Sequence, residues 1–327
     1  MGDAGGAAAG EGSTGGGQAR RGGTGGCAGS EQGGRGAAAG GQGERGAAGG
    51  GQGERGAAHV FVDDLEHPVL VDDDHRHLER VLRLRAGETV SAADDAGGWR
   101  LLRWEGAGRL TPAGGIEHHA RPEPAITVAF ALMKGDRLDW VVQKLTELGV
   151  DRIIPMTTQR VIVRWDEARA DRAVHRLRSV ARAAAMQSRR VWLPRVDGVR
   201  SFSDLATEAA ADRATEAAAD RATESAAGRD EGGEAEGGPA VLGPAVLGPA
   251  VLAVPGGGSF GLDRPTVLIG PEGGWSPDEV SCGLPTVGLG PTILRVETAA
   301  AAAGLLLMAL RSGIVAPPAA SNSDPTF

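Results

Sequence analysis

The sequence predicts an α/β protein that is built on a parallel sheet and preceded by a small β-rich domain. An apolar strand, an amphipathic helix and a second apolar strand follow one another over residues 126–156, which is the order of a βαβ unit. Residues 266–269 are another short apolar run, and they pass directly into glycine and a helix start, as a buried parallel strand does. Residues 59–121 hold short apolar runs between Asp and Gly turns, which is typical of a small β domain.

The β-rich domain is expected to contain short strands and one helix. The strands are expected at residues 59–62, 88–91 and 98–102. The helix is expected to cover His75–Leu84, because Leu78, Val81 and Leu82 recur at helical spacing and would share one face.

The parallel-sheet domain is expected over residues 125–315. Its first elements are expected as a strand at 126–132, a helix at Asp136–Leu148, a strand at 152–156 and a helix at Asp171–Gln187. The first helix carries its apolar residues on one face, and Gly149 ends it. The first strand is apolar throughout, which indicates burial on both faces of the sheet.

A low-complexity insertion interrupts this domain at about residues 203–248. Residues 206–229 repeat A-T-E-A-A-A-D-R with a period of eight, and a helix of that composition has no apolar face. We therefore expect it to be solvated and marginally stable. Residues 238–252 repeat G-P-A-V-L, and because proline disrupts central strands, only Ala250–Val254 is expected to form a core strand.

The ends and the composition of the chain exclude several classes of protein. Residues 1–58 are rich in Gly and Ala and hold too little apolar material for a core, so they predict a disordered tail or a start site assigned too far upstream. Residues 316–327 predict a second disordered tail. No signal-peptide segment is present, the longest apolar run (299–310) is too short for a membrane span, and the two cysteines have no disulfide or metal-ligand spacing. These features predict a cytoplasmic protein without membrane association or bound metal.

The charge is unevenly distributed along the chain. The formal net charge is −8, yet residues 134–200 hold fifteen Lys and Arg against eight Asp and Glu. Residues 203–237 hold three Arg against ten Asp and Glu, so the acidic excess lies in the insertion. A local basic face, rather than net charge, indicates nucleic-acid binding. Arg80 and Arg83, on the helix of the β-rich domain, are either a solvated helix face or phosphate contacts.

The loop after residues 266–269 is the most informative segment of the chain. Gly270, Gly273 and Gly274 lack a Cβ, so they let the backbone approach a ligand closely. Residues 276–279, Ser-Pro-Asp-Glu, then predict a helix start with an N-cap, a first-turn proline and a capping box. A plain strand–turn–helix connection is the alternative. The residues of a P-loop or of a dinucleotide-binding GxGxxG motif are absent.

A second glycine turn, Leu289-Gly290-Pro291, leads to Arg295 and Glu297 and then to the apolar helix Thr298–Leu310. This helix is apolar on nearly every side and is expected to be buried. Burying two charged residues between a glycine turn and a buried helix costs free energy unless they form an ion pair or contact a ligand. A structural Arg295–Glu297 ion pair and a functional role are therefore the two alternatives.

In residue identity and in order along the chain, segments 267–279 and 287–299 resemble the RsmE family, the SPOUT-class enzymes that methylate N3 of a uridine in small-subunit ribosomal RNA. The resemblance implies a trefoil-knotted parallel-sheet domain preceded by a PUA-like β-barrel, and a homodimer. It also implies S-adenosylmethionine as cofactor and 16S ribosomal RNA of the small subunit as partner.

Shorter motifs extend the resemblance. Residues 143–150, QKLTELGV, match the QKxxELGV motif of the family. Residues 158–161 resemble its SER turn, with Gln in place of the acidic residue. Further on, Gln187 and Arg190 match the family pattern, but Met186 stands where the family usually has Glu. Any role of that glutamate is absent or relocated in this chain.

The resemblance implies three groups of site residues. The expected cofactor-binding residues are Leu268, Ile269, Gly270, Pro271, Glu272, Gly273, Gly274, Leu289, Gly290, Ile293, Leu294 and Thr298. The expected RNA-binding residues are Arg80, Arg83, Lys144, Arg160, Gln187 and Arg190. The expected catalytic residues are Arg295 and Glu297. For Lys144, an i,i+3 surface pair with Glu147 is the alternative to a role in substrate binding or dimerisation.

The reaction implied is attack of uracil N3 on the methyl group of the cofactor. Loss of the imide proton spreads negative charge over N3, O2 and O4, which Arg295 is expected to stabilise. Glu297 is expected either to orient that arginine or to take the proton. One alternative is a ribose 2′-O-methyltransferase, whose usual Ser-Leu-Asn-Val loop differs from residues 293–298. The other is a catalytically silent RNA-binding or ribosome-assembly factor, which the intact glycine loops disfavour.

Overall fold

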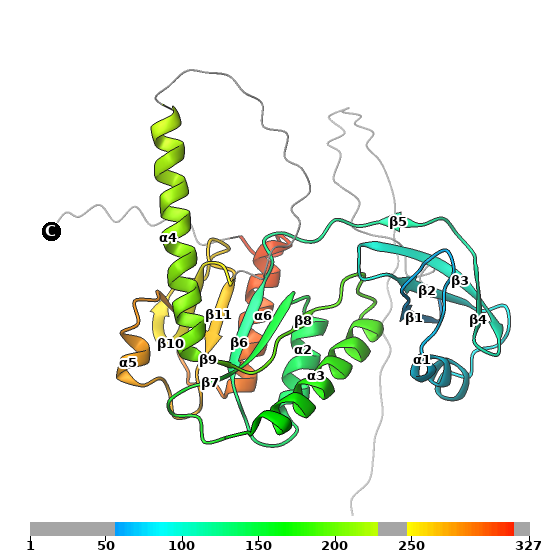
Figure 1. The fold of residues 1–327 in the computed structure, drawn as a ribbon, viewed down its shortest axis with the longest axis horizontal. Coiled ribbons are helices and arrows are strands. Elements are labelled where there is room, and N and C mark those ends of the chain that lie inside the picture. The colour runs from blue at the N-terminus through cyan, green and yellow to red at the C-terminus, as the bar shows by residue number, and fades with distance from the viewer. Residues whose placement is uncertain (1–55, 228–246, 317–327) are drawn as a thin grey trace, which may run out of the picture. The chain divides into compact units, whose positions relative to one another are not determined.

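The structure is a computed structural model that describes residues 56–227 and 247–316, with side chains described for 56–215 and 247–316 (Figure 1). The expectations for residues 1–55, for the G-P-A-V-L copies before 247 and for the tail after 316 lie outside the described residues.

The first sheet is mixed. In the described chain its strands are β1 (Ala58–Phe61), β2 (Thr89–Ala93), β3 (Gly98–Gly106), β4 (Arg109–Pro112) and β5 (Glu117–His118). The order is β1-β2-β3-β4, with β1 parallel to β2, the other pairs antiparallel and β5 on β3. Val60, Leu102 and Trp104 are buried in its core. The three predicted strands are confirmed within one or two residues at their starts, whereas β4 and β5 were not predicted.

The predicted helix His75–Leu84 was wrong in its extent and in its buried face. Helix α1 (Asp72–Arg76) continues as a π-helical turn, η1 (His77–Val81). Of the three apolar residues only Leu78 is buried, while Val81 is 66% and Leu82 43% exposed. The prediction assumed 3.6 residues per turn, but the wider turn changes the phase of the face.

The second sheet has all its described strand pairs parallel. Its strands are β6 (Thr127–Ala131), β7 (Arg152–Thr157), β8 (Arg195–Val196), β9 (Arg200–Ser201), β10 (Ala250–Gly258), β11 (Thr266–Ile269) and β12 (Thr286–Val287). The order is β12-β10-β11-β6-β7-β8, with β9 also on β7. The predicted βαβ unit is confirmed, since β6 and β7 are joined through helix α2 (Arg137–Glu147).

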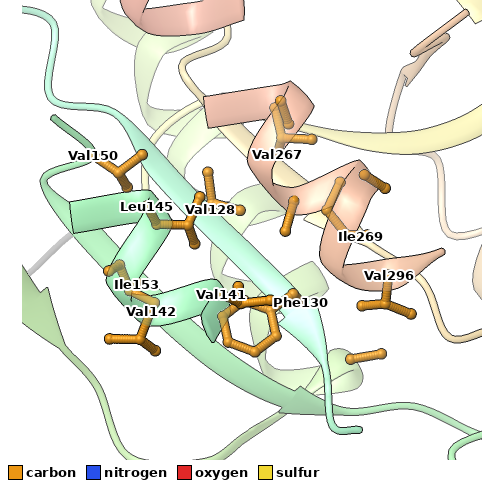
Figure 2. Close-up of a cluster of buried hydrophobic side chains, with 14 of the residues drawn as sticks. Val128, Phe130, Val141, Val142, Leu145, Val150, Ile153, Val267, Ile269 and Val296 are labelled. Carbon is orange, nitrogen blue, oxygen red and sulfur yellow. The ribbon is translucent and has the colours of Figure 1, made fainter. Parts of the chain in front are cut away.

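Helices pack on both faces of this sheet (Figure 1). They are α3 (Glu167–Gln187), α4 (Phe202–Ala227), α5 (Pro277–Val280) and α6 (Val296–Arg311), together with α2. Successive strand residues alternate between two cores, as the pleat requires. Val128, Phe130, Val267 and Ile269 face α2 and α6 (Figure 2). Ala129, Ile154, Leu252 and Leu268 face the opposite core, with Trp275 and the start of α4.

The predicted solvated helix of the insertion is corrected at its start. Helix α4 begins at Phe202, and Phe202, Leu205 and Ala209 are all buried against the sheet. The repeat by itself has no apolar face of large side chains. Ala209 lies on the same helix face as Phe202 and Leu205, however, and extends the contact of that face with the sheet. The carboxylate of Asp212 also accepts a hydrogen bond from Gly248 N at 2.9 Å. The first part of the insertion therefore belongs to the packed domain.

Helix α6 is buried on one face only, which corrects the expectation of general burial. Ala300, Ala303 and Leu307 are fully buried against β6, β11 and α2. By contrast, Leu305 is 48% and Leu306 is 37% exposed.

Candidate active site

A cavity of about 330 Å³ lies beside the loops that follow β11 and β12. Its volume falls in the range of small-molecule sites. The wall is formed by residues 253–255 of β10, by residues 269–275, by the segment 289–294 and by the start of α6. Loops at the carboxyl ends of parallel strands are the usual position for a ligand in such a sheet.

Trp275 holds the first loop in shape. A Cβ on Gly270 would lie 2.8 Å from Cε2 of this indole, so only glycine permits the packing. The indole Nε1 donates a hydrogen bond to Ala253 O at 2.9 Å, which ties the loop to β10. Gly274 has a φ of +69° and donates its N–H to Pro271 O at 2.8 Å, which closes the turn. Trp275 was not singled out from the sequence.

The predicted capping box at the start of α5 is confirmed. Ser276 Oγ accepts from Glu279 N at 3.2 Å, and Glu279 Oε2 accepts from Ser276 N at 2.8 Å. The other oxygen of Glu279 accepts from Gln159 N at 2.7 Å, so this carboxylate also joins the loop after β7. Next to it, Arg160 Nη1 donates to Gly273 O at 3.0 Å. Arg160 therefore contacts the backbone of the glycine loop directly.

The second loop is more open. Gly290 has a φ of +125°, which favours glycine, and a Cβ there would meet nothing within 4 Å. Ile293 is 88% exposed beside the cavity.

All but two of the residues predicted to bind a cofactor line the cavity. Leu268 does not, because alternation along β11 turns it into the core with Leu252 and Trp275. Thr298 is exposed on the first turn of α6 and does not line the cavity either.

Glu297 pairs with Arg137 instead of Arg295. Arg137 Nη1 lies 3.7 Å from Glu297 Oε1 and 3.4 Å from Glu272 Oε1, so one guanidinium joins the glycine loop to α6. The Glu297 side chain is 15% exposed, and its Oε2 is buried without a hydrogen-bond partner among the described residues. Arg295 is the N-cap residue of α6, and its exposed guanidinium forms no ion pair within the described chain. The Arg295–Glu297 ion pair is therefore not formed.

Arg137 is a candidate residue that the sequence did not indicate. It is the first residue of α2, after β6, and β6 is the neighbour of β11 in the sheet. The register of Phe130 against Ile269 carries the following loops to the same edge. Finding Arg137 requires knowing that β6 lies next to β11 in the sheet, and no local sequence pattern gives the order of strands.

The six predicted RNA-binding residues are not gathered in one place. Arg80 and Arg83 are exposed at the end of η1, and Gln187 is exposed beside a cavity of about 620 Å³ that also touches His59, Arg182 and Arg189. Lys144 forms the alternative i,i+3 ion pair with Glu147, at 2.7 Å. Arg160 lies at the glycine loop.

Arg190 is largely committed to the fold. Its Nη1 donates to Thr146 O at 3.0 Å and to Val150 O at 2.8 Å. Burial lowers the pKa of this guanidinium to about 10, and the group stays charged at neutral pH. Its backbone oxygen accepts a hydrogen bond from His59 Nε2 at 2.9 Å, and burial lowers the pKa of that imidazole to about 4.

Within the described residues, no group of three or more His, Cys, Asp and Glu side chains is arranged to hold a metal ion. No helix in the same part of the chain is both long and apolar enough to cross a membrane.

Comparison with known proteins places these features in one family. A family model for an RNA methyltransferase domain matches residues 121–241 and 259–308. The chain is 33% identical over 248 residues to the ribosomal RNA small subunit methyltransferase E of Mycobacterium bovis, covering 72% of this chain and 83% of that one. It is 28% identical to the protein of the same name from Bacillus subtilis, covering 70% and 85%.

Two solved structures share the fold. A ribosomal RNA small subunit methyltransferase E from Neisseria gonorrhoeae, bound to S-adenosyl methionine, is 25% identical with a TM-score of 0.56, covering 77% of this chain and 97% of that one. A probable rRNA-methyltransferase from Porphyromonas gingivalis, 24% identical, has a TM-score of 0.57 and coverage of 79% and 100%.

Proposed function

The chain belongs to the ribosomal RNA small subunit methyltransferase E family, and from this premise we propose that it transfers a methyl group from S-adenosylmethionine to N3 of a uridine in 16S ribosomal RNA. The observation that carries the proposal is the meeting of two unlike glycine loops at one cavity, with Glu297 and Arg137 beside it.

We extend the proposal to the finer features of the fold. Residues 59–121 would form a PUA-like RNA-binding domain and residues 125–315 a knotted SPOUT domain that holds the cofactor. Low-complexity residues at about 203–248 would contribute no chemistry. The cytoplasm, where small ribosomal subunits are found, would be its location.

The volume and the lining of the cavity support S-adenosylmethionine as its ligand. Glycines at 270, 273, 274 and 290 leave backbone groups accessible, and the remaining wall is mainly apolar, as an adenine and a thioether-like chain require. Backbone groups of residues 270–274 and 289–294 would hold the cofactor. When bound, it supplies an electrophilic methyl group on a sulfonium.

Residues of this chain would then stabilise the negative charge that develops on the uracil and accept the proton that it loses. Arg295 carries an exposed guanidinium at the edge of the second loop with no ion pair among the described residues, and it would stabilise the negative charge on O2 and O4 as N3 loses its proton. Glu297 has one oxygen beside Arg137 and one buried oxygen without a donor among the described residues, and it would accept the proton that N3 loses. Arg137 would act as a positioning residue that fixes the Glu297 carboxylate.

A homodimer would account for the exposed apolar side chains of two neighbouring helices. Trp140 on α2 is 43% exposed, and Leu305 and Leu306 on α6 are 48% and 37% exposed. Helix α2 packs against α6, so these side chains lie on neighbouring helices. A second copy of the chain would bury these side chains. Sedimentation velocity should give a single species of twice the mass of the chain.

The proposal is tested with small ribosomal subunits from cells that lack this gene, incubated with the purified protein and methyl-labelled S-adenosylmethionine. We expect one labelled uridine, carrying the methyl group on N3. Label on a ribose 2′-oxygen would favour the related class of enzyme. Cofactor binding without transfer would favour a silent ribosome-binding factor.

A further inference from the structure

A cavity of about 700 Å³ lies at the opposite edge of the second sheet from the candidate active site. It is bounded by α3, by the segment 193–200 that contains β8 and β9, and by Arg121 in the linker between the sheets. Strands β6 and β7 separate β8 from β11 in the sheet (Figure 1). The two cavities share no lining residue, so this one is distinct from the one at the glycine loops. Its arginines are Arg121, Arg178, Arg182, Arg195 and Arg200.

Three of these arginines are paired within the protein. Arg182 Nη2 lies 2.6 Å from Asp74 Oδ2. Arg195 pairs with Asp197 at 2.7 Å, and Arg200 pairs with Glu208 at 2.9 Å. These side chains shape the wall, but most of their charge is already balanced.

Arg121 and Arg178 have no carboxylate within ion-pair distance in the described chain. Arg178 is exposed, and among the described residues it donates only its Nε, to Val196 O at 3.0 Å, so neither terminal nitrogen has a partner in that part of the chain. The guanidinium of Arg121 lies 4.8 Å from the centre of the Trp192 ring, and its Nε is buried without a hydrogen-bond partner among the described residues.

Two acids, Asp95 and Asp197, also line this cavity, and Asp197 is paired with Arg152 and Arg195. Asp95 accepts a hydrogen bond from Leu193 N at 2.6 Å, and burial raises the pKa of its carboxyl despite the nearby charge of Arg121. Among the described residues, the wall therefore presents two guanidinium groups, from separate elements, that no carboxylate pairs directly. A buried charged donor without an acceptor is costly, so an anionic ligand would recover that free energy.

We propose that this cavity binds phosphate groups of the RNA backbone, through Arg121 and Arg178. A planar guanidinium that is stacked on an aromatic ring keeps its N–H edge free, and that edge matches phosphate geometry. Arg178 lies in the chain's basic segment, residues 134–200, and Arg121 precedes that segment; the volume of the cavity, about 700 Å³, exceeds that of a single phosphate ion. The inference rests on the proposed function and adds an anchoring site to it, remote from methyl transfer.

The test compares two double variants that remove the same charge. Arg121→Gln/Arg178→Gln changes the cavity, whereas Arg172→Gln/Arg264→Gln removes two exposed arginines that do not line it. Binding of each protein to labelled small ribosomal subunits is measured between 50 and 200 mM salt. Loss of two phosphate contacts should flatten the slope of log K against log salt by roughly 1.4 to 1.8 for the cavity variant, with the control close to wild type.

Calorimetric binding of S-adenosylmethionine should be unchanged in both variants, which shows that each is folded. Arg178→Glu alone, at an exposed position, should weaken subunit binding in the same way if the double variant folds poorly. Equal slopes for wild type and the cavity variant, or an equal loss in the control, would overturn the cavity proposal alone. A wild-type protein that binds the cofactor but no ribosomal RNA would overturn the proposed function as well.

Discussion

The two loops of the candidate active site differ in how firmly the rest of the protein holds them. The first loop is fixed from three sides, by Trp275 over Gly270, by Arg160 on Gly273 O and by Glu279 through Gln159. In the second loop, residues 289–295, no side chain forms a hydrogen bond or an ion pair with another described residue. Polar contacts therefore hold the first wall, whereas the second wall is held by the packing of Leu289 and Leu294 against the core.

This difference suggests a division of roles. Changes in the first loop should act through folding and cofactor binding. Changes at the edge of the second loop should act on the transfer step, because its exposed charge is available to the substrate.

Gly270→Val should abolish S-adenosylmethionine binding and destabilise the protein. Its side chain would collide with the Trp275 indole, where a Cβ alone lies 2.8 Å from Cε2, and overpacking of this kind costs about 1–3 kcal/mol. Thermal unfolding and calorimetry measure the two effects. Gly115→Val is the control, because a Cβ at Gly115 meets nothing within 4 Å. A Gly270→Val protein with normal cofactor affinity would show that the first loop is adaptable.

Arg295→Ala should leave cofactor binding nearly intact and slow methyl transfer by roughly 10²–10³-fold, the usual effect of losing one electrostatic stabiliser. A cationic sulfonium gains nothing from a neighbouring guanidinium, so the loss should be confined to the transition state. Single-turnover methylation of small subunits gives the rate, and calorimetry gives the affinity. If both fall equally, Arg295 has a structural role and the division between the loops fails.

Glu279→Ala should lower the free energy of unfolding by about 1–3 kcal/mol, because it removes the carboxylate half of the capping box and leaves the backbone N–H groups of Ser276 and Gln159 without that acceptor. The side chain is buried, with only 3% of the residue exposed. Urea denaturation measures the change. Asp278→Ala, at the exposed neighbouring position, should be close to neutral. A similar cost for both variants would contradict the anchoring role.

Arg137→Gln should slow transfer by roughly tenfold, with cofactor affinity within about twofold of wild type, because it leaves Glu297 charged but unpositioned. A double-mutant cycle with Glu297→Gln should show that the two losses are not additive. Lys134→Gln removes an exposed charge nearby and serves as control. Additive losses would mean that Arg137 acts independently of Glu297.

Local patterns in the sequence were sufficient for many of the elements that build the site. Strand β11 at Thr266–Ile269 and the Ser276–Glu279 capping box match the predictions residue for residue. Helix α2 and strand β7 do so within one residue at each end. These features depend on side-chain periodicity, glycine and capping, which are properties of a few consecutive residues.

The tertiary structure decided which residues meet. Arg137 reaches Glu272 across 135 positions, and Glu279 reaches Gln159 across 120, so no local pattern reports either contact. The same holds for burial: Ala209 is covered because α4 lies on the sheet, while Leu305 and Leu306 remain exposed on a helix that is apolar almost all round. Sequence alone determined the strands, the glycine loops and the charged residues available, because these are set by neighbouring residues. The partner of each charge and the covered face of each helix depend on strand order and packing, which bring distant segments together.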